Sequence, residues 1–491
     1  MNLSGRISQI HMNIFRNAST KVNSKAKFNF KLSANVDESI KNGSVKTRHH
    51  AGVMGVGVVQ LPEALSQAAI NALKDHPEKV LRADANKLSN YIWSRHAPLE
   101  KDEYRHKIKE VEDTVTEEEM VDPLSPGIAA ELRERLLDSR QSKVMQKAKK
   151  NIYNWKPINY NDYRAALYVT GRLAPDYASL YKIMAEVKKR DPHFSPLTLL
   201  DFGSGVGTSM WAVDSIWPGK CKEAVCIDSS SEMNDMANKL LREGDSDKPL
   251  RTRPGGTFFR QFLPMSSTLK YDVVVSSRSL FELPDMASRL RTIDILWRKT
   301  SKYLILVEAG TNAGYRLVQE ARDYVLEVAQ RSQEEREYLE GHVFSPCPHD
   351  MFCPRFFDGS NTPCNFEVSY KPFKFGKYSD TGKELFTYVV IKKGRRNDDV
   401  GENVTWPRVV RAPLCRTRHV ICRTCTKYGT LQEFTVTKKR HGKECYQVSK
   451  NSDWGDMLPI EFPEPYLPDE SNPISDADQS NENDLVRYSS A

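Results

Sequence analysis

Residues 199–208 read LLDFGSGVGT, an apolar segment that runs directly into three glycines at alternate positions and then into a helix predicted to begin near Ser209. Glycine lets the chain turn tightly and lets a ligand approach the backbone, because no Cβ stands in the way. Backbone N–H groups at the start of the following helix can then hold a polar or negatively charged group. This stretch therefore predicts a strand, a ligand-binding turn and a helix in direct succession.

The segments after the glycine turn supply the rest of one recognisable fold in order. The next strand, Ala224–Ile227, ends in Asp228, whose carboxylate can accept hydrogen bonds from both hydroxyls of a ribose. Strands at Tyr271–Ser276 and Tyr303–Val307 follow, separated by longer periodic segments, and such alternation predicts βαβ units and a parallel sheet. The spacing G-x-G-x-G after an acidic residue differs from the dinucleotide spacing G-x-G-x-x-G and is typical of S-adenosylmethionine enzymes. We therefore predict a class I S-adenosylmethionine-dependent methyltransferase core, an α/β Rossmann-like fold, whose cofactor-binding residues are Asp201, Gly203, Gly205, Gly207 and Asp228.

The place where a methyl acceptor enters such a fold carries no recognisable catalytic motif. Enzymes that methylate the amino groups of bases carry Asn or Asp followed by Pro-Pro-Tyr after the fourth strand, where this chain reads Ser277-Arg278-Ser279-Leu280. Enzymes that methylate a pyrimidine carbon use a cysteine near the fourth or fifth strand, and none lies there. Because methyl transfer needs an in-line nucleophile freed by a base or by desolvation, the catalytic residues stay unassigned.

Composition and charge restrict the class of protein. A chain of 491 residues exceeds what one hydrophobic core usually supports, so two or three structural units are expected. The longest nearly apolar run, Ala51–Leu61, is shorter than the roughly 20 residues that cross a bilayer, so no membrane association is predicted. The net charge of +8 favours a polyanionic partner. Basic residues gather at 143–150, next to Tyr153 and Trp155, and again between Lys392 and Arg440, where they are either a phosphate-binding surface or merely solvated faces.

The amino-terminal segment differs from the rest of the chain. No acidic residue precedes Asp37, whereas six Lys or Arg residues and several serines are present, and Ile7, Ile10 and Ile14 recur at helical spacing. This pattern predicts a mitochondrial transit peptide, and a disordered basic tail is the alternative. The predicted organisation is a transit peptide at 1–36, a helical region at 45–190, the methyltransferase core at 191–335, a cysteine-containing β-rich basic module at 340–460 and a disordered acidic tail at 461–491.

Seven of the nine cysteines lie beyond residue 340. Cys347, Cys353 and Cys364 are close in sequence and flanked by prolines that stiffen the segment, and Cys422 and Cys425 follow later. Soft thiolates in such a set suit an iron–sulfur cluster or zinc, and the spacing alone does not choose between them. The alternative is a group of buried free cysteines, which behave as small apolar residues.

Five motifs together resemble one family. They are Leu200–Thr208 with Trp211-Ala212, Leu280–Pro284, Val307–Thr311, Pro346–Asp350 and Ser452–Asp456. Over roughly Asn159–Pro459 the chain is similar to the family of methyltransferase-like protein 17, the mitochondrial small-ribosomal-subunit methyltransferase-like family, which has fungal and bacterial relatives.

The resemblance implies a protein of the mitochondrial matrix that binds the small ribosomal subunit and its rRNA during assembly and supports translation. We expect the protein to be monomeric. The resemblance also implies a [4Fe–4S] cluster on Cys347, Cys353, Cys364 and one cysteine of the stretch His419–Gly429, with Cys425 fitting best and Cys422 as the alternative. Zinc is the alternative metal.

Three functions compete on the sequence alone. The first is an assembly factor that carries a cofactor fold and a metal module and grips rRNA; the absent catalytic motif favours it. The second is an active S-adenosylmethionine-dependent rRNA methyltransferase. The third is a small-molecule methyltransferase, against which the basic carboxy-terminal stretch argues, because a small substrate gives no reason for so much positive charge.

Overall fold

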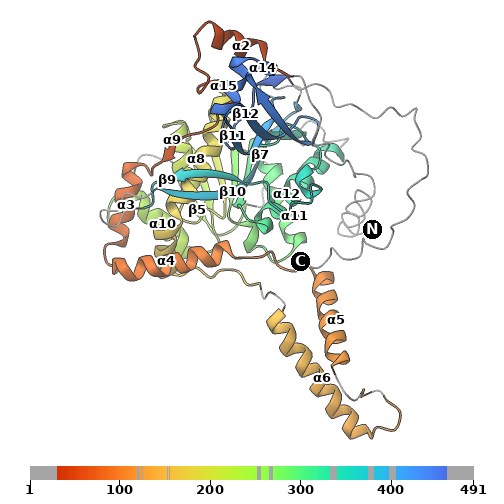
Figure 1. Cartoon of the computed structure of the whole chain (residues 1–491). Helices are drawn as coiled ribbons and strands as arrows, with labels where there is room; N and C mark the ends of the chain where they lie inside the picture. Colours follow the sequence, from red (N-terminus) through yellow and green to blue (C-terminus); the bar gives the residue numbers. More distant parts are fainter. Residues whose placement is uncertain are drawn as a thin grey trace, which may run out of the picture.

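The computed structural model describes residues 30–118, 122–123, 125–151, 153, 155–251, 256–264, 269–331, 340–373, 381–396 and 405–461. Within these residues a nine-stranded sheet forms the centre of the molecule, in the order β2-β9-β10-β7-β6-β3-β4-β5, with β8 also paired to β10 (Figure 1). The parallel strands are β3 (Thr198–Phe202), β4 (Glu223–Ile227), β5 (Thr257–Arg260), β6 (Tyr271–Ser277) and β7 (Thr300–Ala309).

The far side of the sheet is completed by strands that come later in the chain or from its beginning. β10 runs antiparallel to its neighbours β7, β8 and β9, whereas the short β2 is parallel to β9. Their bounds are β2 (Val58–Val59), β8 (Gly341–Ser345), β9 (Phe366–Tyr370) and β10 (Gly382–Lys393). The order β5-β4-β3-β6-β7 followed by an antiparallel strand is that of class I methyltransferases, and the predicted fold class is confirmed.

Helices cover both faces of this sheet, because successive side chains of a strand point to opposite faces. Leu199 of β3 joins the hydrophobic cluster that contains α8 and α9, whereas Leu200 joins the cluster that contains α11 and α12. Continuous apolar runs such as Leu304–Val307 are typical of strands buried on both sides. The helices are α8 (Leu173–Arg190), α9 (Thr208–Ile216), α10 (Ser231–Leu241), α11 (Met286–Lys299) and α12 (Asn312–Arg331), and the short turn η1 (Leu280–Glu282) follows β6.

The amino-terminal helices divide into a packed group and a projecting arm. The packed helices are α3 (Glu63–Leu73), α4 (Glu78–Trp93) and α7 (Asp162–Gly171), whereas α2 (Ala34–Lys41) lies apart from them, against the smaller sheet described below (Figure 1). The arm is the antiparallel pair α5 (Lys101–Glu117) and α6 (Ala130–Asn151), which extends away from the body (Figure 1). Its helices share a small cluster of Val111, Val115 and Val144.

A second, three-stranded sheet lies beside the core. It consists of β11 (Arg408–Cys415), β12 (His419–Cys425) and β13 (Leu431–Thr437), followed by α14 (Lys438–His441) and α15 (Lys443–Asn451). The strands β1 (Lys31–Leu32) and β14 (Ile460–Glu461) pair antiparallel, so the two ends of the described chain meet there. The hydrophobic cluster of this unit contains Phe30 and Leu32 together with Phe434 and Ile460.

Most sequence-based expectations about elements hold, and some do not. Within the predicted helical region 45–190, the apolar residues Leu65, Ala68, Ala69, Ala72 and Leu73 form the buried face of α3. The apolar residues of α6 do not form a core face, because Leu132 and Leu137 are exposed on the arm. No helix among the described residues is long and apolar enough to cross a membrane.

The proposed domain boundaries stay a prediction, and the sheet adds two facts about them. Strands β8, β9 and β10, which come after residue 340, belong to the same sheet as β3–β7. Of the predicted transit peptide, residues 1–29 lie outside the described part, whereas Phe30, Leu32 and Val36 are buried. The predicted acidic tail lies outside the described residues from position 462.

Candidate functional site

The glycine turn connects β3 to α9 at the carboxyl end of the sheet. Gly203, Gly205 and Gly207 have φ values of 70°, 52° and 79°, a region that other residues rarely adopt. A Cβ on Gly203 would lie 2.3 Å from the Cβ of Ser279, so the segment after β6 approaches the turn directly. The local backbone therefore requires glycine, as the sequence predicts.

The two predicted acidic residues lie beside this turn. Asp228, directly after β4, accepts hydrogen bonds from the backbone N–H of Gly205 (2.8 Å) and of Ser230 (2.9 Å). Burial raises the pKa of its carboxyl group in spite of these bonds. The structure thus brings the acid after β4 and the glycine turn after β3 together, where nucleoside ligands bind in open α/β sheets.

Asp201 is the more unusual of the two acids. Its side chain is 1% exposed, and among the described residues neither carboxylate oxygen makes a hydrogen bond of good geometry, although the Ser209 side chain lies nearby. Burial raises the pKa of Asp201 to about 7; the Ser209 side chain acts in the opposite direction, and the charge of Asp228 adds to the rise. A buried polar group without a partner is costly, and a cationic ligand group such as the ammonium of S-adenosylmethionine would relieve that cost. The residues present therefore fit the predicted cofactor.

The acceptor side of the crevice is closed by a buried group of ion pairs. Arg278, at the end of β6, has a φ of 60° and donates from Nε to Asp176 (3.2 Å) and from Nη2 to Glu384 (2.7 Å). Arg172 pairs with the same two carboxylates, at 2.5 Å and 2.8 Å. Although burial raises the pKa of Asp176, the two guanidinium groups outweigh it and lower that pKa. The sequence indicates no role for Arg172, Asp176 or Glu384, since Glu384 lies more than 200 positions from the other two and no local pattern connects them.

One further carboxyl group lies next to the acceptor turn. Glu308 of β7 is 1% exposed and accepts a hydrogen bond from the backbone N–H of Leu280 (2.8 Å). Its second oxygen has no partner among the described residues, and burial raises the pKa of Glu308 to about 7. The group is therefore poised to exchange a proton near neutral pH.

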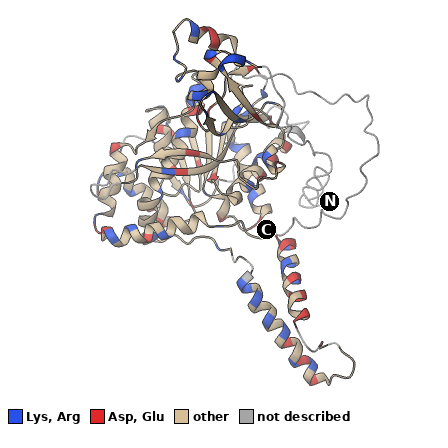
Figure 2. Cartoon of the chain, viewed as in Figure 1, with Lys and Arg blue, Asp and Glu red and all other residues tan. Residues whose placement is uncertain are grey.

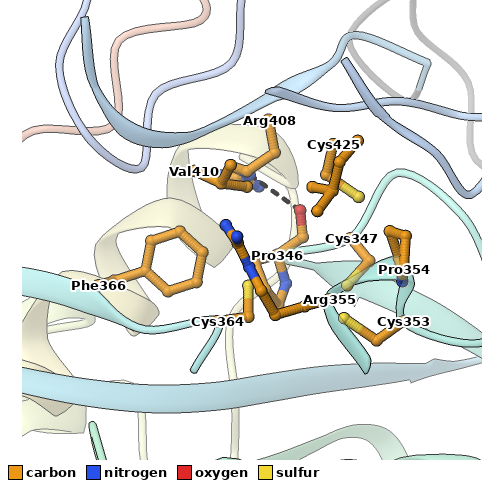
Figure 3. A pocket seen from close by; sticks show the side chains of 11 residues that line it. Pro346, Cys347, Cys353, Pro354, Arg355, Cys364, Phe366, Arg408, Val410 and Cys425 are labelled. Atoms are coloured by element: carbon orange, nitrogen blue, oxygen red, sulfur yellow. Dashed lines mark hydrogen bonds between the residues drawn. The ribbon is translucent and has the colours of Figure 1, made fainter. Parts of the chain in front are cut away.

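Four thiols converge on a second site, a small cavity between the core and the three-stranded sheet (Figure 3). Cys347, Cys353 and Cys364 come from the segment between β8 and β9, and Cys425 is the last residue of β12. Cys347, Cys353 and Cys425 are buried, whereas Cys364 is half-buried. All four predicted ligands line this cavity, which brings residues 347 and 425 together across 78 positions of sequence.

Cys422, the alternative fourth ligand, lies elsewhere. It is separated from Cys425 by three positions of β12, and an odd separation places two strand residues on opposite faces. Cys422 belongs to the hydrophobic cluster that also contains Cys445. Burial raises the pKa of both thiols to about 12, as expected of cysteines that act as apolar core residues.

Positive charge surrounds the four-thiol cavity. Burial raises the pKa of Cys347 to about 12, and Arg322 and Arg408 act in the opposite direction. Arg322 is fully buried and donates from Nη2 to the carbonyl oxygens of His349 (3.3 Å) and Met351 (2.6 Å). Four thiolates would place several negative charges in a buried space, and these guanidinium groups offset part of that cost.

The donor set decides which inorganic centre the cavity fits. Sulfur ligands favour iron–sulfur clusters or zinc over hard ions such as magnesium. Within the described ranges, no three His, Cys, Asp or Glu side chains are grouped closely enough to hold one metal ion. The thiols thus converge on a shared cavity without a preformed single-ion geometry, and their role as ligands stays a prediction.

Arg408 fastens the thiol segment to the core. Its guanidinium donates to the carbonyl oxygen of Pro346 (2.9 Å), to that of Gly455 (2.7 Å) and to the carboxylate of Glu186 (2.6 Å). Burial raises the pKa of Glu186, but Arg408 and Arg190 outweigh it and lower that pKa to about 2. The sequence places Arg408 in a basic surface stretch, and this is wrong, because the side chain is 1% exposed and holds β8, β11 and α8 together.

Exposed basic residues gather around the small sheet and on α6 (Figure 2). Around the sheet they are Arg416, Arg418, Arg423, Lys438, Lys439, Arg440, Lys443 and Lys450. The two aromatic residues that follow α6 make contacts within the protein: Trp155 donates from Nε1 to the carbonyl oxygen of Phe281 (2.8 Å), and Tyr153 packs edge-on against His96. The exposed basic residues around the small sheet are therefore the stronger candidate for a phosphate-binding surface.

Comparison with known proteins connects this architecture to ribosome assembly proteins. A family model described as mitochondrial small ribosomal subunit Rsm22 matches residues 162–459. A human protein named ribosome assembly protein METTL17, mitochondrial, is 35% identical over 86% of this chain and 87% of its own length. Ribosome assembly protein RSM22, mitochondrial, of Saccharomyces cerevisiae is 20% identical over 57% of this chain and 65% of its own length. Rsm22-cox11 tandem protein 2 of Schizosaccharomyces pombe is 27% identical over 61% of this chain, which spans 44% of that protein.

Solved structures show a more distant likeness. Magnesium protoporphyrin IX methyltransferase from Synechocystis PCC 6803 is 11% identical with a TM-score of 0.29, covering 55% of this chain and 100% of that chain. A putative RNA methyltransferase from Pyrococcus horikoshii is 10% identical with a TM-score of 0.25, covering 45% and 84%. At this level of similarity neither structure adds anything about cofactor or substrate.

Proposed function

Because the chain belongs to the mitochondrial small ribosomal subunit Rsm22 family, we propose that it is an assembly protein of the mitochondrial small ribosomal subunit that binds immature rRNA. The observation that carries the proposal is the convergence of Cys347, Cys353, Cys364 and Cys425 on one cavity between the core and the basic sheet. A metal centre there would fix the basic sheet against the core. We further propose that the protein acts in the mitochondrial matrix as a monomer.

A [4Fe–4S] cluster is the proposed occupant of the cavity, with zinc as the alternative. Four cysteine thiolates are the usual ligands of such a cluster. Four thiolates could also hold a single zinc ion, at Zn–S distances of about 2.3 Å, and metal analysis distinguishes the two occupants. When bound, the centre would supply bonds between β12 and the segment before β9.

The basic surface of the small sheet is the proposed contact with rRNA. Arg416 and Arg418 lie exposed in the turn between β11 and β12, and Lys439 and Lys443 are exposed at α14 and α15. Phosphate contacts supply most of the sequence-independent affinity for nucleic acid and make binding sensitive to salt. S-adenosylmethionine in the glycine crevice would stabilise the core that carries this surface, with Asp201 and Asp228 holding its polar groups.

The proposal is tested by metal analysis together with rRNA crosslinking. Protein purified without oxygen should contain iron and acid-labile sulfide, and Cys347→Ser should lose both, along with crosslinking to small-subunit rRNA in isolated mitochondria. Cys445→Ser is the matched control, because it removes an equally buried thiol outside the cavity. Stoichiometric zinc without iron would show that zinc, and not a [4Fe–4S] cluster, occupies the cavity. Normal crosslinking by metal-free Cys347→Ser would contradict the proposed link between the thiol site and rRNA.

Active methyl transfer to rRNA is the second candidate, and Glu308 favours it. A buried carboxyl group whose pKa is raised to about 7 beside the acceptor turn could remove a proton from a methylated nucleophile. One observation argues against methyl transfer. Arg278, directly after β6, forms buried ion pairs with Asp176 and Glu384 at the place where a methyl acceptor would enter. Asp228→Ala and Gly205→Arg should abolish a specific methyl mark on rRNA if the protein is an enzyme, and should change no mark if the cofactor is structural.

A further inference from the structure

A short segment between the arm and α7 is fastened at two separate places on the core. Trp155 donates from Nε1 to the carbonyl oxygen of Phe281 (2.8 Å), and the backbone N–H of Ile158 donates to Glu282 Oε2 (2.9 Å). Two residues further on, the carbonyl oxygen of Tyr160 accepts a hydrogen bond from Ser230 Oγ (3.1 Å). The first attachment lies in the turn after β6, and the second lies after β4.

The sheet order shows what lies between these attachments. Strand β3 stands between β6 and β4, and the glycine turn leaves its carboxyl end. A segment fastened after β6 and after β4 therefore passes over the end of β3 and over the crevice that Gly205 and Asp228 form. Ligands of open α/β sheets bind outside the carboxyl ends of the strands at this location.

The side chain of Tyr160 supports this placement. The residue is half-buried, and Glu282, Asp228, Asp176 and the cation Arg95 all lie near enough to act electrostatically on its hydroxyl group. Its ring packs edge-on against Tyr168, with the centroids 5.8 Å apart, and the Tyr168 hydroxyl donates to Asp176 (2.8 Å). The ring of Tyr160 is therefore fixed against α7, and its backbone is fastened to the segment after β4.

The β6 side of the segment has a further support. Arg95, which is 3% exposed, forms an ion pair with Glu282 and donates to the carbonyl oxygen of Lys156 (3.1 Å). Its Nη2 also donates to the carbonyl oxygen of Phe281 (3.3 Å). The buried guanidinium of Arg95 thus connects the segment to the turn η1. Arg95 itself comes shortly before α5, the first helix of the arm.

We propose that Trp155–Tyr160 is a strap that closes the cofactor crevice and must lift for a nucleoside ligand to enter or leave. The inference rests on the proposed cofactor site and adds control of access to it. The strap is held by a few hydrogen bonds to polar atoms at its two ends, and Lys156, Pro157 and Asn159 are exposed. Each hydrogen bond contributes only a modest net free energy, so the strap can open without unfolding the core.

The test uses the full-length protein with its thiol site loaded and S-adenosylhomocysteine as an unreactive probe. Trp155→Phe removes the indole N–H and keeps an aromatic ring. We expect its association and dissociation rates to rise together, each about fivefold for the loss of one hydrogen bond, with a smaller change in Kd. A residue that merely contacts the ligand would raise the dissociation rate alone. Trp217→Phe is the matched control, because the Trp217 indole also donates to a backbone carbonyl, that of Phe194 (3.1 Å), away from the crevice.

A second measurement needs no variant. Hydrogen exchange at Ile158 in the wild-type protein should slow when S-adenosylhomocysteine saturates the site, because the bound ligand keeps the strap closed. Ligand binding with unchanged rates in Trp155→Phe and unchanged exchange at Ile158 would reject the strap and leave the cofactor site standing. A folded wild-type protein that binds no S-adenosylhomocysteine would reject the cofactor site and the strap together.

Discussion

Asp201 carries a carboxyl group that the fold buries without a hydrogen-bond partner in the described part of the chain. Its pKa is raised from 3.8 to about 7, so the folded protein holds the proton more tightly than the unfolded chain does. The protonated Asp201 therefore makes its full contribution to the free energy of unfolding below about pH 4, and this contribution is lost as the pH rises to about 7. The ligand-free protein is therefore expected to be less stable at pH 8 than at pH 5 on account of this residue.

Asp201→Asn removes the charge and keeps the shape. We expect the free energy of unfolding of the ligand-free variant to be about 2–4 kcal/mol higher than that of the wild type at pH 8, with little difference near pH 4. We also expect the variant to bind S-adenosylhomocysteine more weakly. Denaturant unfolding at both pH values measures the first effect. Asp235→Asn, an exposed change on α10, serves as the control. Equal stability of wild type and Asp201→Asn at pH 8 would show that another group satisfies the carboxylate.

Glu186 presents the opposite case, a buried acid with partners. Its pKa is lowered to about 2 because Arg408 and Arg190 outweigh the effect of burial. The ionised carboxylate therefore stabilises the folded protein above the ordinary pKa of 4.5, and this stabilisation is lost as the pH falls towards 2. Glu186→Gln should cost about 3–5 kcal/mol at pH 7, since it leaves buried guanidinium groups without their counter-ion.

Thermal unfolding at pH 7 measures the effect of Glu186→Gln. Glu78→Gln is the control, because the Glu78–Arg82 pair is the same kind of contact on an exposed helix surface and should change stability little. A small effect of Glu186→Gln would mean that Ser345 and Tyr388, which also contact the carboxylate, are enough to hold this region.

At the scale of elements, strand β12 decides which thiol faces the cavity. Alternation along the strand directs Cys422 into the core with Cys445, and Cys425 at the strand end lines the cavity with the other three thiols. Cys425→Ser should therefore lose most of the iron bound by protein purified without oxygen, whereas Cys422→Ser should keep it. Elemental analysis of the two variants side by side measures this, and iron loss in Cys422→Ser alone would reverse the assignment.

Elements with a strong local signal could be predicted from the sequence. The glycine turn could be predicted because its positive φ values are required locally, and β3 because its apolar residues run directly into that turn. Strands β6 and β7 could be predicted because each contains several consecutive apolar residues. The strands β5 and β9 were missed, because β5 has four residues with Phe258 exposed and β9 follows a segment rich in proline and cysteine.

The partners of buried charges could not be predicted. Arg172 and Glu384 are 212 positions apart, and no local pattern indicates that they pair. The same holds for the attachment of Trp155 to η1, which lies 126 positions away. The sequence therefore predicts the residues of the glycine turn and the thiol set, but not the ion pairs and the strap that enclose the crevice.

At the scale of the whole molecule, the arm and the body should differ in local stability. The cluster between α5 and α6 contains three buried residues, whereas α8 contributes seven buried apolar residues to the main core. Segments with few buried contacts open at low free energy. Amide hydrogens of Lys101–Glu117 and Ala130–Asn151 should therefore exchange orders of magnitude faster than those of α8. Comparable protection in free protein would mean that the arm is held by contacts beyond its own small cluster.

The pairing of β1 with β14 has a consequence for the order in which the protein is completed. Lys31 lies opposite Glu461, and Met54 donates its N–H to Asp456 across 402 positions, so the first described residues find their partners only near the end of the described chain. Closing so long a loop is slow compared with forming local contacts. During synthesis or threading from the amino end, Phe30 stays without its ring partners until Phe434 and His441 have emerged, and Leu32 stays without its strand partner until Ile460 has emerged. A protease that removed the chain from β14 onward would take away the strand that pairs with β1.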